Sequence, residues 1–116
     1  MTHRIYGMSV AKVYPAYLAK VERKGRTQSE LDEVICWLTG HDRASLAVAL
    51  DDGVTMERFF AEAPQMNSAR MQVNGVICGV RIEEIAEPLM REIRILDKLV
   101  DELAKGRPLA KVVRQV

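Results

Sequence analysis

Apolar side chains recur at helical spacing from residue 82 to residue 106, and this is the most strongly patterned stretch of the chain. Steps of three and four residues separate Leu89, Ile93, Leu96, Val100 and Leu103. Such steps place side chains on one face of a helix. Pro88 suits the first turn, where its missing N–H would have no partner, and Gly106 suits the position after the last turn. The pattern therefore predicts a long helix from Pro88 to Lys105, against which the rest of the chain packs.

The first forty residues carry signals for two further helices. Ser9 is a plausible N-cap for a helix whose apolar face continues to Val21, although Pro15 should kink this helix or mark its true start. Thr27 and Glu30 have the spacing of a capping box, in which each side chain satisfies a backbone N–H near the other residue. The box predicts a second helix from this point.

Three shorter helices are expected in the remaining chain. Asp42 can cap one that ends at residues 51–53, and Thr55 can cap another that Pro64 stops. Pro108 can begin a last one near the C-terminus. Helices this short depend on tertiary packing for their stability.

Residues 67–82 fit two structures. Asn74-Gly75 between apolar residues is a hairpin signal. The flanking residues do not alternate, however, and Val73, Ile77 and Val80 follow a helical progression. We favour a helix over residues 71–82 and leave the hairpin open as the alternative.

The totals predict a single domain, residues 1–116, because 116 residues can bury one core. A composition of 48% hydrophobic and 28% charged residues is typical of a globular chain. We therefore expect an all-α domain, a compact bundle of five or six helices around the long C-terminal helix (residues 88–105).

The apolar runs are far shorter than the roughly 20 residues that cross a bilayer, so we expect no membrane partner. The N-terminus lacks the apolar core and cleavage site of a secretory signal. Cys36 and Cys78 form no disulfide framework and lie in apolar segments. Buried thiols in a reducing cytoplasm are the simplest interpretation.

The net charge of +1 gives no general attraction to nucleic acid, but the charge is unevenly distributed. Residues 1–30 carry a net +4, residues 31–69 a net −5 and residues 70–116 a net +2. The local basic cluster at residues 20–26 consists of Lys20, Arg23, Lys24 and Arg26. It precedes a helix, as in helix-turn-helix DNA binders, but Asp32 and Glu33 on that helix would repel phosphates.

Segments spread over nearly the whole chain form a fingerprint. They are residues 2–6, 13–15, 35–40, 59–60 with 63–64, 75–81, and 88–90 through 103–106. On these segments the chain resembles an uncharacterised bacterial family, domain-of-unknown-function family number two thousand two hundred. The resemblance implies a small bacterial cytoplasmic protein and transfers no site residue.

Candidate chemistry is sparse. A reactive thiol needs a nearby cation or helix N-terminus, and both cysteines instead have apolar neighbours. Zinc sites normally contain closely spaced ligand pairs, and no two Cys or His residues lie within four positions of each other. We therefore assign no catalytic, cofactor-binding or metal-binding residue and no cofactor. His3 and His41 remain without a role, and His41 is expected in a solvated loop.

The acidic residues before the long helix are Glu83, Glu84 and Glu87. A helix N-terminus favours negative charge, so we interpret them as structural. Glu92 projects into the apolar stripe, which predicts either burial against a cation such as Arg81 or a position beyond the edge of the core. A functional carboxylate is the remaining alternative. The charged residues between Arg91 and Lys105 are expected to form a solvated outer face.

The function that this pattern favours is a small helix-mediated interaction module. We expect it to form a homodimer or to bind another protein, which the sequence does not define. One alternative is a nucleic-acid-binding protein that uses residues 20–26, although the acidic second helix argues against nucleic acid. Another is an enzyme whose site assembles from positions far apart in the sequence. The interaction module is preferred because apolar patterning is abundant and no polar residues converge.

Overall fold

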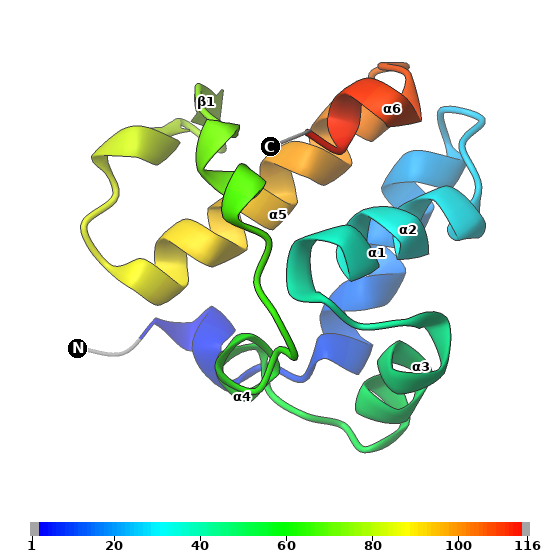
Figure 1. Cartoon of the computed structure of the whole chain (residues 1–116), viewed down its shortest axis with the longest axis vertical. Helices are drawn as coiled ribbons and strands as arrows, with labels where there is room; N and C mark the ends of the chain where they lie inside the picture. Colours follow the sequence, from blue (N-terminus) through cyan, green and yellow to red (C-terminus); the bar gives the residue numbers. More distant parts are fainter. Residues whose placement is uncertain (1–2, 115–116) are drawn as a thin grey trace.

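Figure 1 shows the computed structural model, which describes residues 3–114. Its α-helices are α1 (Val10–Glu22), α2 (Gln28–Thr39), α3 (Arg43–Asp51), α4 (Met56–Ala61), α5 (Pro88–Ala104) and α6 (Leu109–Val112). Three short 3₁₀ helices are η1 (Arg4–Gly7), η2 (Ser68–Gln72) and η3 (Ile82–Glu84). The strands β1 (Val76–Ile77) and β2 (Val80–Arg81) form an antiparallel hairpin. The mostly helical bundle and the long helix from Pro88 are confirmed.

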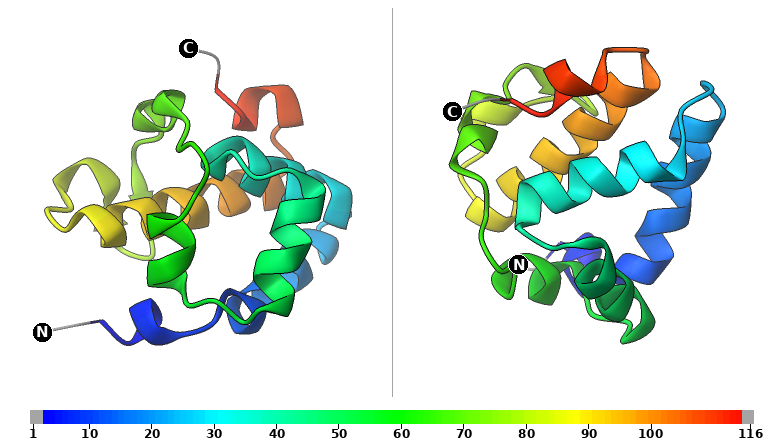
Figure 2. Two further views of the ribbon diagram at one scale, coloured as in Figure 1. Left: turned by 60° about the horizontal axis from the view of Figure 1, so that its bottom comes forward. Right: turned by 45° about the vertical axis from the view of Figure 1, so that its right-hand side comes forward.

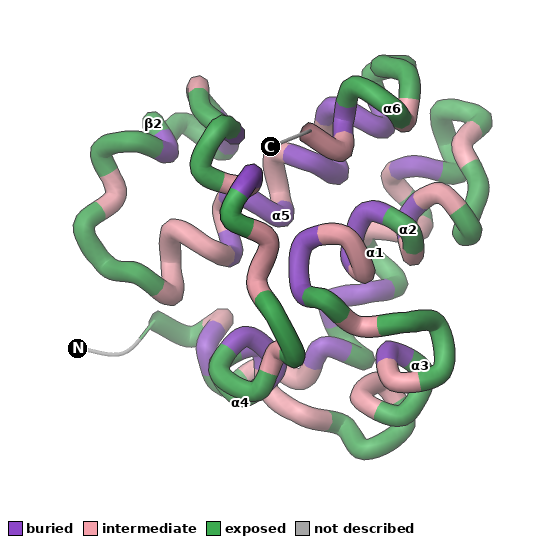
Figure 3. The backbone as a smooth tube through the Cα atoms, in the orientation of Figure 1, coloured by how far each residue is buried: buried purple, intermediate pink, exposed green. Residues whose placement is uncertain are grey.

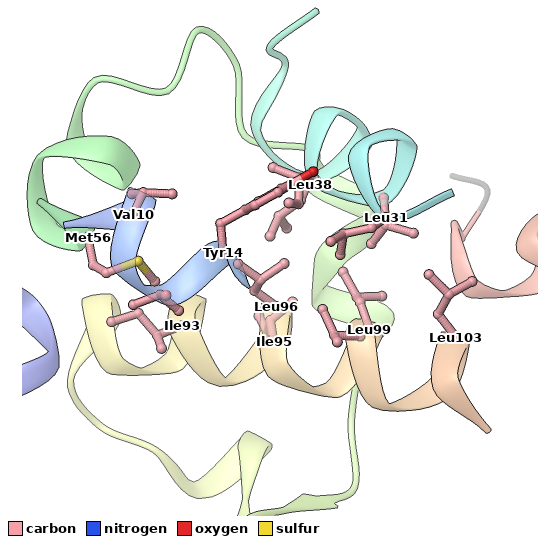
Figure 4. Packing of buried hydrophobic residues seen from close by; sticks show 14 of the residues in the cluster. Val10, Tyr14, Leu31, Leu38, Met56, Ile93, Ile95, Leu96, Leu99 and Leu103 are labelled. Carbon is pink, nitrogen blue, oxygen red and sulfur yellow. The ribbon is translucent and has the colours of Figure 1, made fainter. Parts of the chain in front are cut away.

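Helix α5 crosses the middle of the molecule and packs against both α1 and α2 (Figure 2). Its fully buried residues include Ile93, Ile95, Leu99 and Leu103. In Figure 4 Ile93 lies near Met56 of α4, and Leu99 lies near Leu31 of α2. Burying a side chain of this size contributes roughly 1.5–3 kcal/mol. Helix α5 therefore contributes seven of the 25 buried hydrophobic residues within residues 3–114, more than any other element.

The predicted helix caps are present. The Ser9 hydroxyl accepts the N–H of Lys12, and Thr27 and Glu30 form the reciprocal capping box at the start of α2. Thr55 caps α4 in the same manner as Ser9 caps α1. Helix α1 begins at Val10 and continues through Pro15, so this proline does not mark the helix start.

The helix predicted for residues 71–82 is wrong. This segment contains η2 and the β1–β2 hairpin, and the hairpin turn lies at Cys78-Gly79 rather than at Asn74-Gly75. Both central turn residues have positive φ, 53° for Cys78 and 76° for Gly79, as a type I′ hairpin turn requires. Ile77 and Ile82 anchor the hairpin because both are buried in the core.

The solvated charged face predicted for the long helix is also wrong, except at Lys105, which is exposed. Every residue from 89 to 104 is buried or half-buried (Figure 3). Asp97 accepts hydrogen bonds from Tyr17 and Arg94. Asp101 lies between two ammonium groups, 3.1 Å from Lys20 and 2.9 Å from Lys105. Neighbouring elements therefore cover α5 along its charged positions as well as its apolar ones.

The N-terminal segment holds α4 in place through backbone hydrogen bonds. The N–H of Met56 donates to the carbonyl of Met8 at 2.8 Å, and the N–H of Val10 donates to the carbonyl of Val54 at 2.9 Å. These bonds fix the chain between α3 and α4. None of the helices in residues 3–114 has both the length and the apolar character needed to cross a membrane.

Candidate functional site

A pocket of about 310 Å³ lies between α3 and α4, and we call it the His41 pocket. Its lining residues are His41, Ser45, Val48, Ala49, Asp52, Val54, Phe59 and Glu62. Half of them are apolar, and the others are a histidine, a serine and two acidic residues. An apolar hollow with a few polar groups is the usual form of a small-ligand site.

The local sequence explains how this pocket forms. Gly40 ends α2 in a left-handed conformation, with φ of 82°, so the chain reverses and places His41 beside the start of α3. Asp42 caps α3 by accepting the N–H of Ser45 at 2.7 Å. Gly53 turns the chain after α3, and Thr55 starts α4. The pocket is the space enclosed by these two short helices.

The His41 imidazole is held on two sides. Its Nδ1 lies 2.8 Å from the hydroxyl of Ser45, and its ring stacks on Phe59 with centroids 5.1 Å apart and planes 11° apart. Burial lowers the pKa of His41 below its ordinary value, against the opposing charge of Asp42. The ring is therefore neutral at neutral pH. His41 lies in the loop between α2 and α3 as expected, but the expectation that it is solvated is wrong, because it is half-buried.

The charge of the His41 pocket is negative. Asp52 and Glu62 both line it, whereas no lysine or arginine does. Glu62 pairs with Arg58 at 3.0 Å, but both side chains are mostly exposed and such pairs are weak. The Asp52 carboxylate accepts no side-chain or backbone hydrogen bond from residues 3–114. The pocket is therefore suited to a positively charged ligand with an apolar part.

Ser45 and His41 resemble a nucleophile and its base, but the local bonds indicate a structural role. The Ser45 hydroxyl accepts the backbone N–H of Asp42 at 3.0 Å, as the third residue of a capping box. A nucleophilic hydroxyl must instead be free to reach a substrate. The arrangement therefore favours binding over covalent catalysis.

The prediction that both cysteines are buried is wrong. Cys36 is half-buried, and burial raises the pKa of its thiol, whereas Cys78 is exposed at the tip of the hairpin. Cys78 lines a smaller pocket of about 250 Å³ with Tyr17 and Asp97. The polar groups there bind each other, because the Tyr17 hydroxyl donates to Asp97 at 2.5 Å. That pocket therefore offers less unpaired polar surface than the His41 pocket.

The other histidine lies elsewhere. His3 is 3.3 Å from Glu87, which also accepts the Tyr6 hydroxyl at 2.6 Å. The hydrogen bond from Tyr6 is the main reason that the pKa of Glu87 is lowered. Within residues 3–114, no three His, Cys, Asp or Glu side chains are grouped so that they could hold a metal ion.

Glu92 forms an ion pair, but its partner is not Arg81. The Arg70 guanidinium donates from Nε to both carboxylate oxygens of Glu92, at 2.8 and 3.1 Å, and both side chains are largely buried. Arg81 is exposed. Nearby, Glu83 accepts the N–H of Gly75, and backbone hydrogen bonds lower the pKa of Glu83. The structure therefore gives Glu92 and Glu83 local structural partners.

The basic cluster at residues 20–26 is partly used inside the fold. Lys20 pairs with Asp101, and Arg26 pairs with Glu30 at 2.6 Å. Arg26 also donates to the carbonyls of Leu103 and Arg107, which ties the α1–α2 turn to the end of α5. Arg23 and Lys24 are exposed. Two of the four basic residues, Lys20 and Arg26, are thus engaged in contacts within the fold.

Sequence reasoning did not find the His41 pocket because its residues come from two helices and the turns before and after α3. The only local signal was the four-residue spacing of His41 and Ser45, which lets a loop side chain reach the first turn of a helix. The stacking of His41 on Phe59 is a tertiary contact, with no signal in the local pattern.

Comparison with known proteins places the chain in a family. The family model described as "Uncharacterized protein conserved in bacteria (DUF2200)" matches residues 4–114. The crystal structure of the uncharacterized protein SP1917 is similar, with 49% sequence identity and a TM-score of 0.90 over 97% of this chain and 92% of that chain. A comparison with curated proteins finds no match. The resemblance inferred from the sequence is thus confirmed, and the chain belongs to this family of uncharacterized proteins conserved in bacteria.

Proposed function

We propose that this protein is a small binding module that holds an aliphatic cation in the His41 pocket. The cation is an alkylammonium or alkylguanidinium group, either on a free small molecule or at the end of a partner protein's Lys or Arg side chain. The observation that carries the proposal is the lining itself. Two carboxylates, Asp52 and Glu62, adjoin an apolar wall in a pocket that no cation lines.

The two parts of such a ligand match the two parts of the pocket. The apolar stem would cover Val48 and Val54, and Val48 is 58% exposed in the free chain. The cationic end would lie by the carboxylates. Neutral His41 adds no positive charge beside the carboxylates, and it stays neutral because burial lowers its pKa. The nearest cation is Arg58, whose pair with Glu62 is exposed and therefore weak. Each carboxylate is near the surface, where a charge pair contributes up to about 1 kcal/mol, or roughly fivefold in affinity.

This proposal gives the expected interaction module a defined surface. Helix α5 is covered along its length, so we propose that a partner contacts the α3–α4 face instead. We also propose that the protein forms a homodimer, with the α3–α4 face as the first candidate for its interface. Light scattering at high micromolar concentration tests it, and a monomer there would remove the homodimer. We also propose a cytoplasmic location, supported by the two free cysteines.

Calorimetric titration tests the pocket with three probes that have the same five-carbon stem. We expect n-pentylammonium to bind more tightly than n-pentanol, and hexanoate to show no binding. Asp52→Asn and Glu62→Gln should each weaken pentylammonium binding by roughly two- to fivefold. Glu57→Gln is the matched control, because Glu57 lies on α4 but lines a different pocket. Equal binding of the three probes would contradict the proposal.

A second arm of the experiment distinguishes the two sources of the cation. A blocked lysine, N-acetyl-lysine methylamide, carries the same ammonium group on a peptide backbone. Tighter binding of the blocked lysine than of pentylammonium would indicate a protein partner. The reverse order would indicate a free amine.

A further inference from the structure

A second pocket, of about 530 Å³, lies at the C-terminal end of α2 and is larger than the His41 pocket. Trp37 lines it from the helix, and the segment of residues 64–68 lines the rest. Trp37 is the single tryptophan of the chain and is half-buried. We call this hollow the Trp37 pocket.

The walls of the Trp37 pocket are fixed by the fold. The N–H of Gln65 donates to the carbonyl of Thr39 at 3.0 Å, and the N–H of Asn67 donates to the carbonyl of Leu38 at 3.0 Å. Both carbonyls belong to the last turn of α2, which has no helical N–H to offer them. Gly40 permits this close approach, because a Cβ there would lie 2.7 Å from the backbone of Gln65. The pocket is therefore preorganised by the helix end.

The lining of the Trp37 pocket contains no charged side chain. Besides the indole N–H of Trp37, its side-chain hydrogen-bonding groups are the amides of Gln65 and Asn67 and the hydroxyl of Ser68. Asn67 uses its carbonyl oxygen to accept the N–H of Ala69 at 2.9 Å. The Gln65 amide, the Ser68 hydroxyl and the NH₂ of Asn67 form no hydrogen bond with residues 3–114. An aromatic ring therefore adjoins three neutral polar groups that are available to a ligand.

This chemistry selects against two kinds of ligand. A charged ligand would find no counterion in the lining. Gln65 and Ser68 are exposed, so a purely apolar ligand that covers them would displace their water without replacing its hydrogen bonds, at a cost of about 1–3 kcal/mol for each group that it buries. A ring that has an apolar face and hydroxyl groups at its edge meets both requirements. Its face can cover the indole, and its hydroxyls can bond to the neutral polar groups.

We propose that the Trp37 pocket binds a neutral pyranose sugar. The sugar ring lies against Trp37, and its hydroxyls bond to Gln65 and Ser68. This site is separate from the His41 pocket in both lining and ligand charge. The proposal therefore stands independently of the proposed function.

Tryptophan fluorescence tests this site directly, because Trp37 is the only indole in the chain. Titration with N-acetylglucosamine or glucose should change the emission in a saturable manner, whereas cyclohexanol should bind more weakly because it has a single hydroxyl. Gln65→Ala and Ser68→Ala should each weaken sugar binding by roughly two- to tenfold. Ser29→Ala, at the opposite end of α2, is the control and should leave binding unchanged.

A second measurement detects sugar binding that does not change the fluorescence emission. The indole N–H of Trp37 gives a single NMR signal, which should shift on sugar addition. Absence of both a shift and an emission change with both sugars would overturn the proposal, as would full binding in the Gln65→Ala/Ser68→Ala double variant. n-Pentylammonium should move neither signal, so failure here is distinguishable from failure at the His41 pocket.

Discussion

The Tyr17 hydroxyl donates a hydrogen bond of 2.5 Å to the carboxylate of Asp97, joining α1 to α5 across 80 residues of sequence. The other two tyrosines of the chain do the same with other acidic residues. Tyr6 donates to Glu87 at the start of α5, and Tyr14 donates to Asp32 on α2. The periphery of the apolar core is therefore held by phenol–carboxylate pairs between elements.

These pairs predict an alkaline titration well above the usual range. Burial, followed by the hydrogen-bonded carboxylate, raises the pKa of Tyr6 and of Tyr14 to about 12, and the pKa of Tyr17 also lies well above 10.0. Ultraviolet absorbance of phenolate should stay low in the folded protein at pH 10. The unfolded chain loses these protons first, so stability should fall as the pH rises from about 10 toward 12. Phenolate formation near pH 10 with the fold intact would contradict these pairs.

Removing the Glu92 carboxylate should destabilise the fold. Its pair with Arg70 has two hydrogen bonds and little solvent, so we expect Glu92→Gln to lower the free energy of unfolding by about 1–2 kcal/mol. Glu62→Gln breaks the exposed pair with Arg58 and should change it by less than about 0.5 kcal/mol. Urea unfolding measures both variants. Equal effects would mean that burial does not strengthen the Arg70 pair.

Alanine substitutions at two glycines distinguish the cost of backbone strain from the cost of steric contact. Gly40 and Gly25 have nearly the same φ, 82° and 81°, but only at Gly40 would a Cβ meet other atoms. Gly25→Ala should cost roughly 1–2 kcal/mol for the left-handed conformation alone. Gly40→Ala should cost more, because the backbone of Gln65 must also move. Thermal unfolding of the two variants checks this order, and equal loss would show that residues 64–67 are not held against α2.

The neutral state of His41 predicts an acid-sensitive contribution to stability. Because burial lowers its pKa below 6.5 in the folded chain, the unfolded chain binds a proton more readily. Stability should therefore fall as the pH drops below about 6.5 toward the folded-state pKa. His41→Gln removes this component, so its unfolding free energy should depend less on pH between about pH 7 and pH 5. An unchanged slope would show that His41 titrates freely.

The sequence was most informative where structure is local. Capping residues such as Ser9 and Thr27 act within one helical turn. The apolar stripe on α5 predicts a helix whichever apolar surface packs against it. Residues 71–82 were misassigned because their apolar spacing fits a helix, while the outcome depends on positive φ at Cys78 and Gly79 and on the anchoring of Ile77 and Ile82. The spacing of apolar residues does not show where the backbone φ is positive.

The local sequence pattern did not predict the candidate sites, for a related reason. Burial of Glu92 against a cation such as Arg81 was one of two alternatives that the sequence left open. The cation is Arg70, whose position depends on how η2 meets α5. Cys78 has apolar neighbours in sequence, yet the hairpin exposes it. Burial lowers the pKa of His41, and its ring stacks on Phe59, which lies 18 positions away in the sequence. Such contacts require the tertiary fold.

An NMR titration tests the central claim, that the His41 pocket holds an aliphatic cation. Backbone amide signals of the ¹⁵N-labelled protein are followed while n-pentylammonium is added, with n-pentanol as the neutral comparison. The largest shifts with n-pentylammonium should fall on Ala49, Val54 and their neighbours, saturate, and diminish in Asp52→Asn. Shifts that are absent, that spread evenly over the acidic surface, or that n-pentanol reproduces in full would contradict the account.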